Sequence, residues 1–286
     1  MRALVIGIDS RIGAALAERL AAAGWNVVGT SRRGTPGSLP LDLAALPAVV
    51  SGLATDVCFL CAAMTRQADC QADQDTAWRV NAEAPGRIAQ AVTASGGRTI
   101  LLSTNAVFDG TVGQRAATTP LCPLNSYGRQ KAEAERGVLA TPGAVVLRLT
   151  KVLTPTLPLF RGWITALREG RSVTAFDDLV IAPVSLDDVT AALLHIASAR
   201  ADGIFQASAT VDVSYAEVCR HIAKRVGAAP ALVGTNSIRD AGIPASDAPA
   251  NTTLDASRLA ALTGRPVPAP LDVIDHVYGL APQPAG

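Results

Sequence analysis

The sequence is poor in the features that mark membrane proteins, nucleic-acid-binding proteins and metalloproteins. No apolar run approaches the ~20 residues that cross a bilayer as a helix, and the formal net charge of +1 provides no basic surface for nucleic acid. The three histidines, His195, His221 and His276, lie too far apart to show a metal-ligand spacing. We therefore expect a cytoplasmic chain that binds no metal, nucleic acid or membrane.

Cysteine is also scarce. Five cysteines, an odd number in 286 residues, fit a reducing compartment better than a disulfide framework. Cys58 and Cys61 form a Cys-x-x-Cys sequence, which can bind a metal or act in redox chemistry, but no second pair accompanies it. The stretch 57–60 has the composition of a buried strand, so we expect a strand here rather than a metal or redox site.

Apolar residues are plentiful, at 49% of the chain against 17% charged residues, and they suffice for a well-buried core. Over the first 150 residues, short apolar runs alternate with helical patterns, as in consecutive βαβ units. The expected strands are 3–8, 25–30, 56–60, 99–103 and 144–149, and the expected helices are 12–23, 76–94 (kinked at Pro85) and 125–139. This order predicts an α/β fold with a Rossmann-type doubly wound parallel sheet.

The pattern loosens after residue 150, where Pro155, Pro158 and Pro183 separate irregular apolar runs. We expect an NAD(P)-binding Rossmann domain over residues 1–154, and a smaller, mainly substrate-binding C-terminal lobe over residues 155–286. In this second part, helical patterns cover 186–199 and 215–226. Residues 203–207 have the composition of a strand that returns to the main sheet.

A glycine turn follows the first expected strand. Gly7, Ser10 and Gly13 have the spacing Gly-x-x-Ser-x-x-Gly, with Ser10 where such turns more often have a middle glycine. Glycines let the backbone approach a pyrophosphate, and the next helix offers free N–H groups and the positive end of its dipole. We expect this turn, with Arg11 and Ile12, to bind the cofactor diphosphate, although a strand–turn–helix without a ligand has the same pattern.

The second expected strand ends in basic residues. Many NAD-binding folds carry an acid here that bonds the ribose hydroxyls, whereas this chain has Ser31, Arg32 and Arg33. Two guanidinium groups and a hydroxyl suit the 2′-phosphate of NADP, because arginine binds phosphate through two parallel hydrogen bonds. We therefore expect NADP as the cofactor, with NAD as the alternative; a solvated basic loop also fits.

Tyr127 and Lys131 lie four residues apart in an expected helix, which puts them on one face. The pKa of tyrosine is ordinarily ~10, so the phenol is a poor acid–base catalyst at neutral pH. A neighbouring ammonium favours the phenolate and lowers that pKa. An upstream strand ends at Ser103 and Thr104, whose hydroxyls suit a substrate carbonyl. These residues predict carbonyl reduction, with a surface tyrosine on an amphipathic helix as the structural alternative.

Two segments, LSTNAVFDG (102–110) and PLNSYGRQKAEAE (123–135), resemble the dTDP-4-dehydrorhamnose reductase family of the extended short-chain dehydrogenase/reductases. Shorter matches are Asp56-Val57, Cys61-Ala62-Ala63, Val80-Asn81, Arg148-Leu149-Thr150 and Ala182-Pro183-Val184. The similarity covers nearly the whole chain. Besides Ser10, two departures occur: Asn105 and Ala106 replace an aspartate and a tyrosine, and residues 248–254 lack the family's arginines.

The resemblance implies roles for individual residues. Tyr127 is the expected proton donor, Lys131 tunes the pKa of the phenol and holds the nicotinamide ribose, and Thr104 bonds the substrate carbonyl. The other implied cofactor residues are Asp42 and Leu43 near the adenine, Cys61, Ala62 and Ala63 along the cofactor, and Asn81, which positions the lysine. On the substrate side we expect Asn105, and also Trp163, a large apolar residue for which core packing is an equal alternative.

The implied activity is NADPH-dependent reduction of a keto group, on a nucleotide-linked 4-keto-6-deoxy sugar. Dehydratases of the superfamily carry an Asp-Glu pair after the threonine, and Asn105-Ala106 cannot replace it. A sugar-nucleotide epimerase remains an alternative enzyme. A cofactor-binding regulatory subunit without catalysis is an alternative of another class, and a homodimer is an open expectation.

Overall fold

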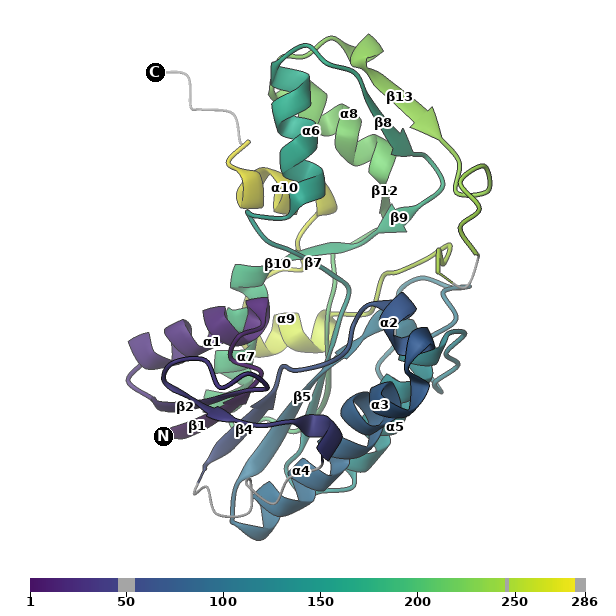
Figure 1. The fold of residues 1–286 in the computed structure, drawn as a ribbon. Coiled ribbons are helices and arrows are strands. Elements are labelled where there is room, and N and C mark those ends of the chain that lie inside the picture. The colour runs from purple at the N-terminus through teal and green to yellow at the C-terminus, as the bar shows by residue number, and fades with distance from the viewer. Residues whose placement is uncertain (46–54, 245–246, 281–286) are drawn as a thin grey trace.

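The structure, a computed structural model, describes residues 1–45, 55–244 and 247–280 and forms two lobes (Figure 1). The larger lobe holds a seven-stranded parallel sheet in the order β11-β6-β5-β4-β1-β2-β3. Its strands are β1 (Arg2–Ile6), β2 (Asn26–Ser31), β3 (Ser38–Pro40), β4 (Val57–Leu60), β5 (Arg98–Thr104), β6 (Val145–Leu149) and β11 (Gly203–Ala207). The strand order reverses at β1, which confirms the predicted Rossmann-type doubly wound fold.

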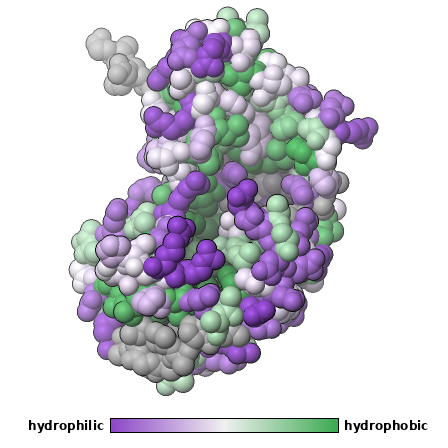
Figure 2. All heavy atoms as spheres, in the orientation of Figure 1, coloured by the Kyte–Doolittle hydropathy of each residue, from purple (hydrophilic) through white to green (hydrophobic). Residues whose placement is uncertain are grey.

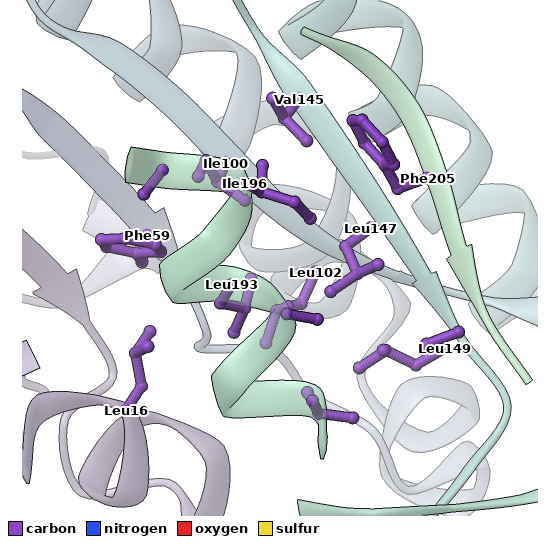
Figure 3. Close-up of a cluster of buried hydrophobic side chains, with 14 of the residues drawn as sticks. Leu16, Phe59, Ile100, Leu102, Val145, Leu147, Leu149, Leu193, Ile196 and Phe205 are labelled. Carbon is purple, nitrogen blue, oxygen red and sulfur yellow. The ribbon is translucent and has the colours of Figure 1, made fainter. Parts of the chain in front are cut away.

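Helices cover both faces of this sheet, so its strands are buried on both sides (Figure 1). One face carries α1 (Arg11–Ala22), α7 (Leu186–Ser198) and α9 (Ser257–Thr263). The other carries α4 (Ala84–Ala94) and α5 (Ser126–Leu139), with α2 (Gln67–Ala72) and α3 (Gln74–Trp78) beside them. Figure 3 shows the first of these two cores, where Leu16 and Leu193 from the helices meet Phe59, Ile100 and Leu147 from the strands.

The smaller lobe has its own hydrophobic core. It is built from α6 (Pro158–Arg168), α8 (Tyr215–Arg225) and α10 (Pro270–Tyr278), with the strand pairs β8 (Val173–Phe176) with β13 (Val233–Asn236), and β9 (Val180–Ile181) with β12 (Val213–Ser214). Four short helical turns connect the larger elements: η1 (Leu43–Ala45), η3 (Arg79–Glu83), η4 (Asn105–Val107) and η5 (Pro230–Leu232). Within the described residues, no helix is both long enough and apolar enough to span a membrane.

The chain passes between the lobes several times. Two short parallel strands, β7 (Lys151–Leu153) and β10 (Pro183–Ser185), lie at the waist between them (Figure 1). After β10, α7 packs in the core of the larger lobe, and β11 then pairs with β6 at the edge of the main sheet. Residues 203–207 therefore form a strand of the main sheet, even though they follow the first part of the smaller lobe.

The long helix expected over residues 76–94 is present as one continuous helical segment, but it contains a π-helical turn that the sequence did not predict. The segment is divided into α3, the π-helical turn η3 and α4. Pro85 is the second residue of α4 and lies two residues after the π-helical turn ends at Glu83. Proline lacks the N–H that a continuous helix would bond at this point, and the wider π-helical turn directly precedes it. Most other predicted boundaries differ from the observed ones by one or two residues.

Candidate active site

The glycine turn between β1 and α1 is tightly folded. Gly7 has a φ of +85°, in the left-handed region that favours glycine, and an added Cβ there would lie 2.7 Å from the Ala62 Cβ. A Cβ on Gly13 would lie 2.1 Å from the carbonyl oxygen of Gly7. Ser10 caps α1 because its hydroxyl accepts a hydrogen bond from the Gly13 N–H at 3.0 Å. The turn thus brings the start of α1 against the loop after β4.

The basic segment after β2 divides into two kinds of residue. Arg32 and Arg33 are exposed, and neither side chain bonds to another residue within the described ranges. Ser31 is buried, and its hydroxyl accepts a hydrogen bond from the Thr35 N–H at 2.9 Å and pairs with the Ser38 hydroxyl at 3.0 Å. The serine therefore closes the loop that presents the two arginines.

The remaining predicted cofactor residues differ in exposure. Arg11 and Asp42 are exposed, Ile12, Cys61, Ala62 and Ala63 are partly buried, and Leu43 is buried. Burial raises the pKa of the Cys58 thiol and raises that of Cys61 to about 12. Both thiols are therefore protonated at neutral pH, which disfavours metal binding or nucleophilic chemistry by this pair.

Thr104 ends β5, at the carboxyl edge of the sheet, and caps the short helix η4. Its hydroxyl accepts a hydrogen bond from the Ala106 N–H at 3.2 Å. The start of α5 packs directly on this turn, because a Cβ on Gly128 would lie 2.1 Å from the Ala106 carbonyl oxygen. Gly128 follows Tyr127, so this close approach holds the tyrosine beside the end of the Thr104 strand.

Tyr127 and Lys131 lie one turn apart on α5, whose cap is the Asn125 side chain. Lys131 is only 2% exposed. Burial lowers the pKa of Lys131 to about 8, against the opposing effect of the Glu135 carboxylate. Burial, with a smaller effect of the Cys70 thiolate, raises the pKa of Tyr127 to about 12, so the predicted lowering is not found. At neutral pH Tyr127 is protonated, as a proton donor must be.

Asn81 lies in the π-helical turn η3 and is 1% exposed. Its Oδ1 accepts a hydrogen bond from the Met64 N–H at 2.8 Å, and its Nδ2 donates to the Met64 carbonyl at 2.8 Å. Nδ2 also donates to Oε1 of Gln130 at 2.8 Å. Asn81 therefore ties the loop after β4 to α5 through Gln130, the residue immediately before Lys131.

A buried network of charged and polar side chains lies next to Lys131 and was not predicted from the sequence. Glu135 and Arg148 form an ion pair with Nη2–Oε2 at 2.7 Å, and their side chains are 1% and 2% exposed. Ser103 donates a hydrogen bond to Oε1 of Glu135 at 2.5 Å. The sequence does contain an indication of this network. Arg148 interrupts an otherwise apolar strand, and a charge buried in a strand needs a partner. The network joins β5, α5 and β6 below the site.

A cavity of about 400 Å³ opens between the two lobes. Figure 2 shows this hollow, with hydrophilic side chains around its rim. Thr104 and Asn105 line it from the larger lobe, Lys151 from the waist and Tyr215 from the smaller lobe. The cavity thus lies at the carboxyl edge of a doubly wound sheet, where such folds bind their ligands.

Trp163 lies elsewhere. It is 8% exposed and packs edge-on against Phe160, with the ring centroids 5.2 Å apart, inside the core of the smaller lobe. It does not line the cavity between the lobes. Of the two interpretations of Trp163, the structure shows core packing, because α6 turns this side chain toward α8. Tyr215, which packs against Trp163, reaches the cavity instead.

Comparison with known families identifies the group to which this geometry belongs. Residues 1–276 match the family described as RmlD substrate binding domain. The chain belongs to this family. The match confirms the resemblance to the dTDP-4-dehydrorhamnose reductase family, and it makes the chain an NAD(P)-dependent oxidoreductase of the extended short-chain dehydrogenase/reductase type.

Relatives of the RmlD-family chain differ in their named activities. A probable low-salt glycan biosynthesis reductase, Agl14 of Haloferax volcanii, is 28% identical over 274 residues, 91% of each chain. A dTDP-4-dehydrorhamnose reductase of Mycobacterium tuberculosis is 33% identical over 187 residues, 62% of each chain. The methionine adenosyltransferase 2 subunit beta of Rattus norvegicus is 28% identical over 82% of this chain and 65% of its own.

Solved structures share the fold over almost the whole RmlD-family chain. A dTDP-4-dehydrorhamnose reductase from Clostridium acetobutylicum superposes with a TM-score of 0.83 at 20% identity, covering 98% of this chain and 99% of its own. MoeE5 in complex with UDP-glucuronic acid and NAD has a TM-score of 0.80 at 25% identity, covering 98% of this chain and 97% of its own. MoeE5 is also known in complex with UDP-glucose and NAD.

Proposed function

We propose that this RmlD-family chain uses NADPH to reduce a keto group on a nucleotide-linked sugar. One observation supports the proposal: Thr104 ends β5 and lines the cavity, and the start of α5, the helix that carries Tyr127 and Lys131, packs on the turn directly after Thr104. Relatives named as reductases support the reaction class. The smaller lobe, with residues 179–181 and Tyr215, would supply the substrate side of the cavity.

The residues present fit a dinucleotide. The tight Gly7–Gly13 turn keeps side chains away from the N-terminus of α1, where a diphosphate would bind. Arg32 and Arg33 stand exposed after β2, where the 2′-phosphate of NADP would lie. We therefore propose NADPH as the preferred cofactor and NADH as the weaker one.

The bound cofactor supplies the hydride. In the proposed reaction, Thr104 donates a hydrogen bond to the carbonyl oxygen and orients it toward Tyr127. Negative charge develops on that oxygen, and Tyr127 donates the proton that neutralises it. Lys131 stabilises the tyrosinate that remains and holds the nicotinamide ribose, as the family resemblance implies.

The test is a panel of nucleotide-linked 4-keto sugars mixed with NADPH, followed at the nicotinamide absorbance. The proposal expects at least one member, a 4-keto-6-deoxy sugar such as dTDP-4-dehydrorhamnose first, to oxidise NADPH in stoichiometric amounts. Turnover of a sugar nucleotide without net consumption of NADPH would identify an epimerase instead. NADPH binding with no turnover of any member would favour the alternative of a cofactor-binding subunit without catalysis; one relative is named as a subunit of another enzyme.

A further inference from the structure

Lys151 is a cation of the cavity that the proposed reaction does not use. It is the first residue of β7, at the waist, and lines the same cavity as Thr104 and Asn105. The next two residues of the strand pack in the hydrophobic cores. Val152 packs against the core of the larger lobe, and Leu153 is buried in the core of the smaller lobe. The Lys151 side chain, by contrast, is exposed and is one of those that line the cleft.

No acid neutralises this ammonium. Across the ranges that the structure describes, the Lys151 side chain forms no hydrogen bond or ion pair with another residue. The other lining residue with a full positive charge, Arg115, is already paired with Asp109 at 2.7 Å. Loss of hydration, and then repulsion by the Arg11 guanidinium, lower the pKa of Lys151. An anion is therefore the group that this part of the cavity accommodates best.

The position of the Lys151 ammonium relative to Thr104 indicates which part of the substrate would carry the anionic group. Thr104 pairs with Leu149 across β5 and β6, and Lys151 is two residues further along. Thr104 at the end of β5 and Lys151 at the start of β7 both line the same cavity. A sugar ring whose carbonyl is bonded by Thr104 therefore lies in the cavity that Lys151 also lines.

We propose that Lys151 binds a carboxylate on the keto-bearing sugar ring, so that the substrate is a nucleotide-linked keto-uronic acid. The proposal rests on the proposed function. The substrate that it names carries a carboxylate at C6, where a 6-deoxy sugar carries a methyl group. In a 4-keto sugar nucleotide, the diphosphate is attached at C1, across the ring from the carbonyl. An anion beside the carbonyl is therefore a ring substituent, and the C6 carboxylate of a uronic acid is adjacent to it.

The experiment compares two ligands that differ only at C6, UDP-glucuronic acid and UDP-glucose. Protein saturated with NADP is titrated with each by calorimetry, using wild type, Lys151→Met, Lys151→Gln and the matched control Lys224→Met. Lys224 is exposed on α8 and does not line the cavity, so its loss removes one charge without touching the site. NADP affinity is measured for all four proteins.

Wild type and Lys224→Met are expected to bind UDP-glucuronic acid at least about tenfold more tightly than UDP-glucose, as a charge-assisted hydrogen bond predicts. Lys151→Met and Lys151→Gln should lose that preference and keep the affinity for UDP-glucose and NADP. A preference that is absent from wild type, or that survives in both Lys151 variants, would overturn the proposal while the reductase function stands. Weaker NADP binding with the preference intact would assign Lys151 to the cofactor diphosphate and also overturn it. If neither UDP-sugar binds, the proposal is overturned, whereas the reductase function is decided separately by the panel of nucleotide-linked 4-keto sugars.

Discussion

Replacing Glu135 by glutamine tests the buried network beneath the site. The substitution keeps the shape of the side chain but removes its charge, and it leaves the Arg148 guanidinium, 2% exposed, without a carboxylate. The wild-type pair is held by Nη2–Oε2 at 2.7 Å and Nε–Oε1 at 3.0 Å, and Ser103 donates to the same carboxylate. Breaking a buried pair in this way costs about 3–5 kcal/mol of unfolding free energy.

For a chain of this size, that loss should lower the midpoint of thermal unfolding by roughly 6–10 °C. Glu133→Gln is the matched control, because it makes the same change on the same helix but breaks an exposed pair with Arg136. The control should change the unfolding free energy by no more than about 1 kcal/mol. Circular dichroism or calorimetry of the three proteins gives the comparison. Equal midpoints for Glu135→Gln and Glu133→Gln would refute the view that this buried pair supports α5.

Other predictions concern the cofactor and the pH dependence. Lys131 has a pKa of about 8 and must be charged to assist Tyr127, so the turnover number should fall as pH rises above about 8. Glu135→Gln removes the carboxylate that raises this pKa and should move the falling limb to lower pH; a pH profile unchanged between the two proteins would contradict this. Gly13→Val places side-chain carbon against the Gly7 carbonyl and should abolish NADPH binding in calorimetry, with some loss of stability. Undiminished affinity would put the diphosphate elsewhere. Replacing Arg32 and Arg33 together by alanine should weaken NADPH by at least about tenfold and spare NADH, whereas equal affinity of wild type for both cofactors would exclude a 2′-phosphate site.

Local patterns were sufficient to predict most of the sheet. Strands β1, β4, β5 and β6 are short apolar runs bounded by turns. The spacing of their apolar residues and the length of each run are enough to identify them as strands. Residues 203–207 were also recognised from their composition as a strand that returns to the main sheet, where β11 forms an edge. The π-helical turn within residues 76–94 was not predictable in this way. It coincides with the contacts of Asn81 with Met64 and Gln130, which are formed only in the tertiary structure.

In the candidate site, too, some features could be predicted from the sequence and others could not. The spacing of Tyr127 and Lys131 along one helix, and of Gly7 and Gly13 around one turn, is visible in the sequence. The partners of Arg148 and the exposure of Lys151 to the cavity depend on which elements become neighbours, and sequence spacing does not contain that information. The pKa of Tyr127 was predicted with the wrong sign because the spacing reveals the neighbouring ammonium but not the depth of burial.

The most direct test of the central claim is the turnover of Tyr127→Phe with NADPH and the keto sugar nucleotide that wild type reduces. Phenylalanine keeps the ring and its packing but removes the proton that the carbonyl oxygen requires. General acid catalysis contributes roughly 10²–10⁴-fold, so turnover should fall by that factor while NADPH affinity stays nearly unchanged. Thr104→Val should likewise lower turnover and leave NADPH affinity unchanged. Reduction by Tyr127→Phe at the wild-type rate would contradict the account.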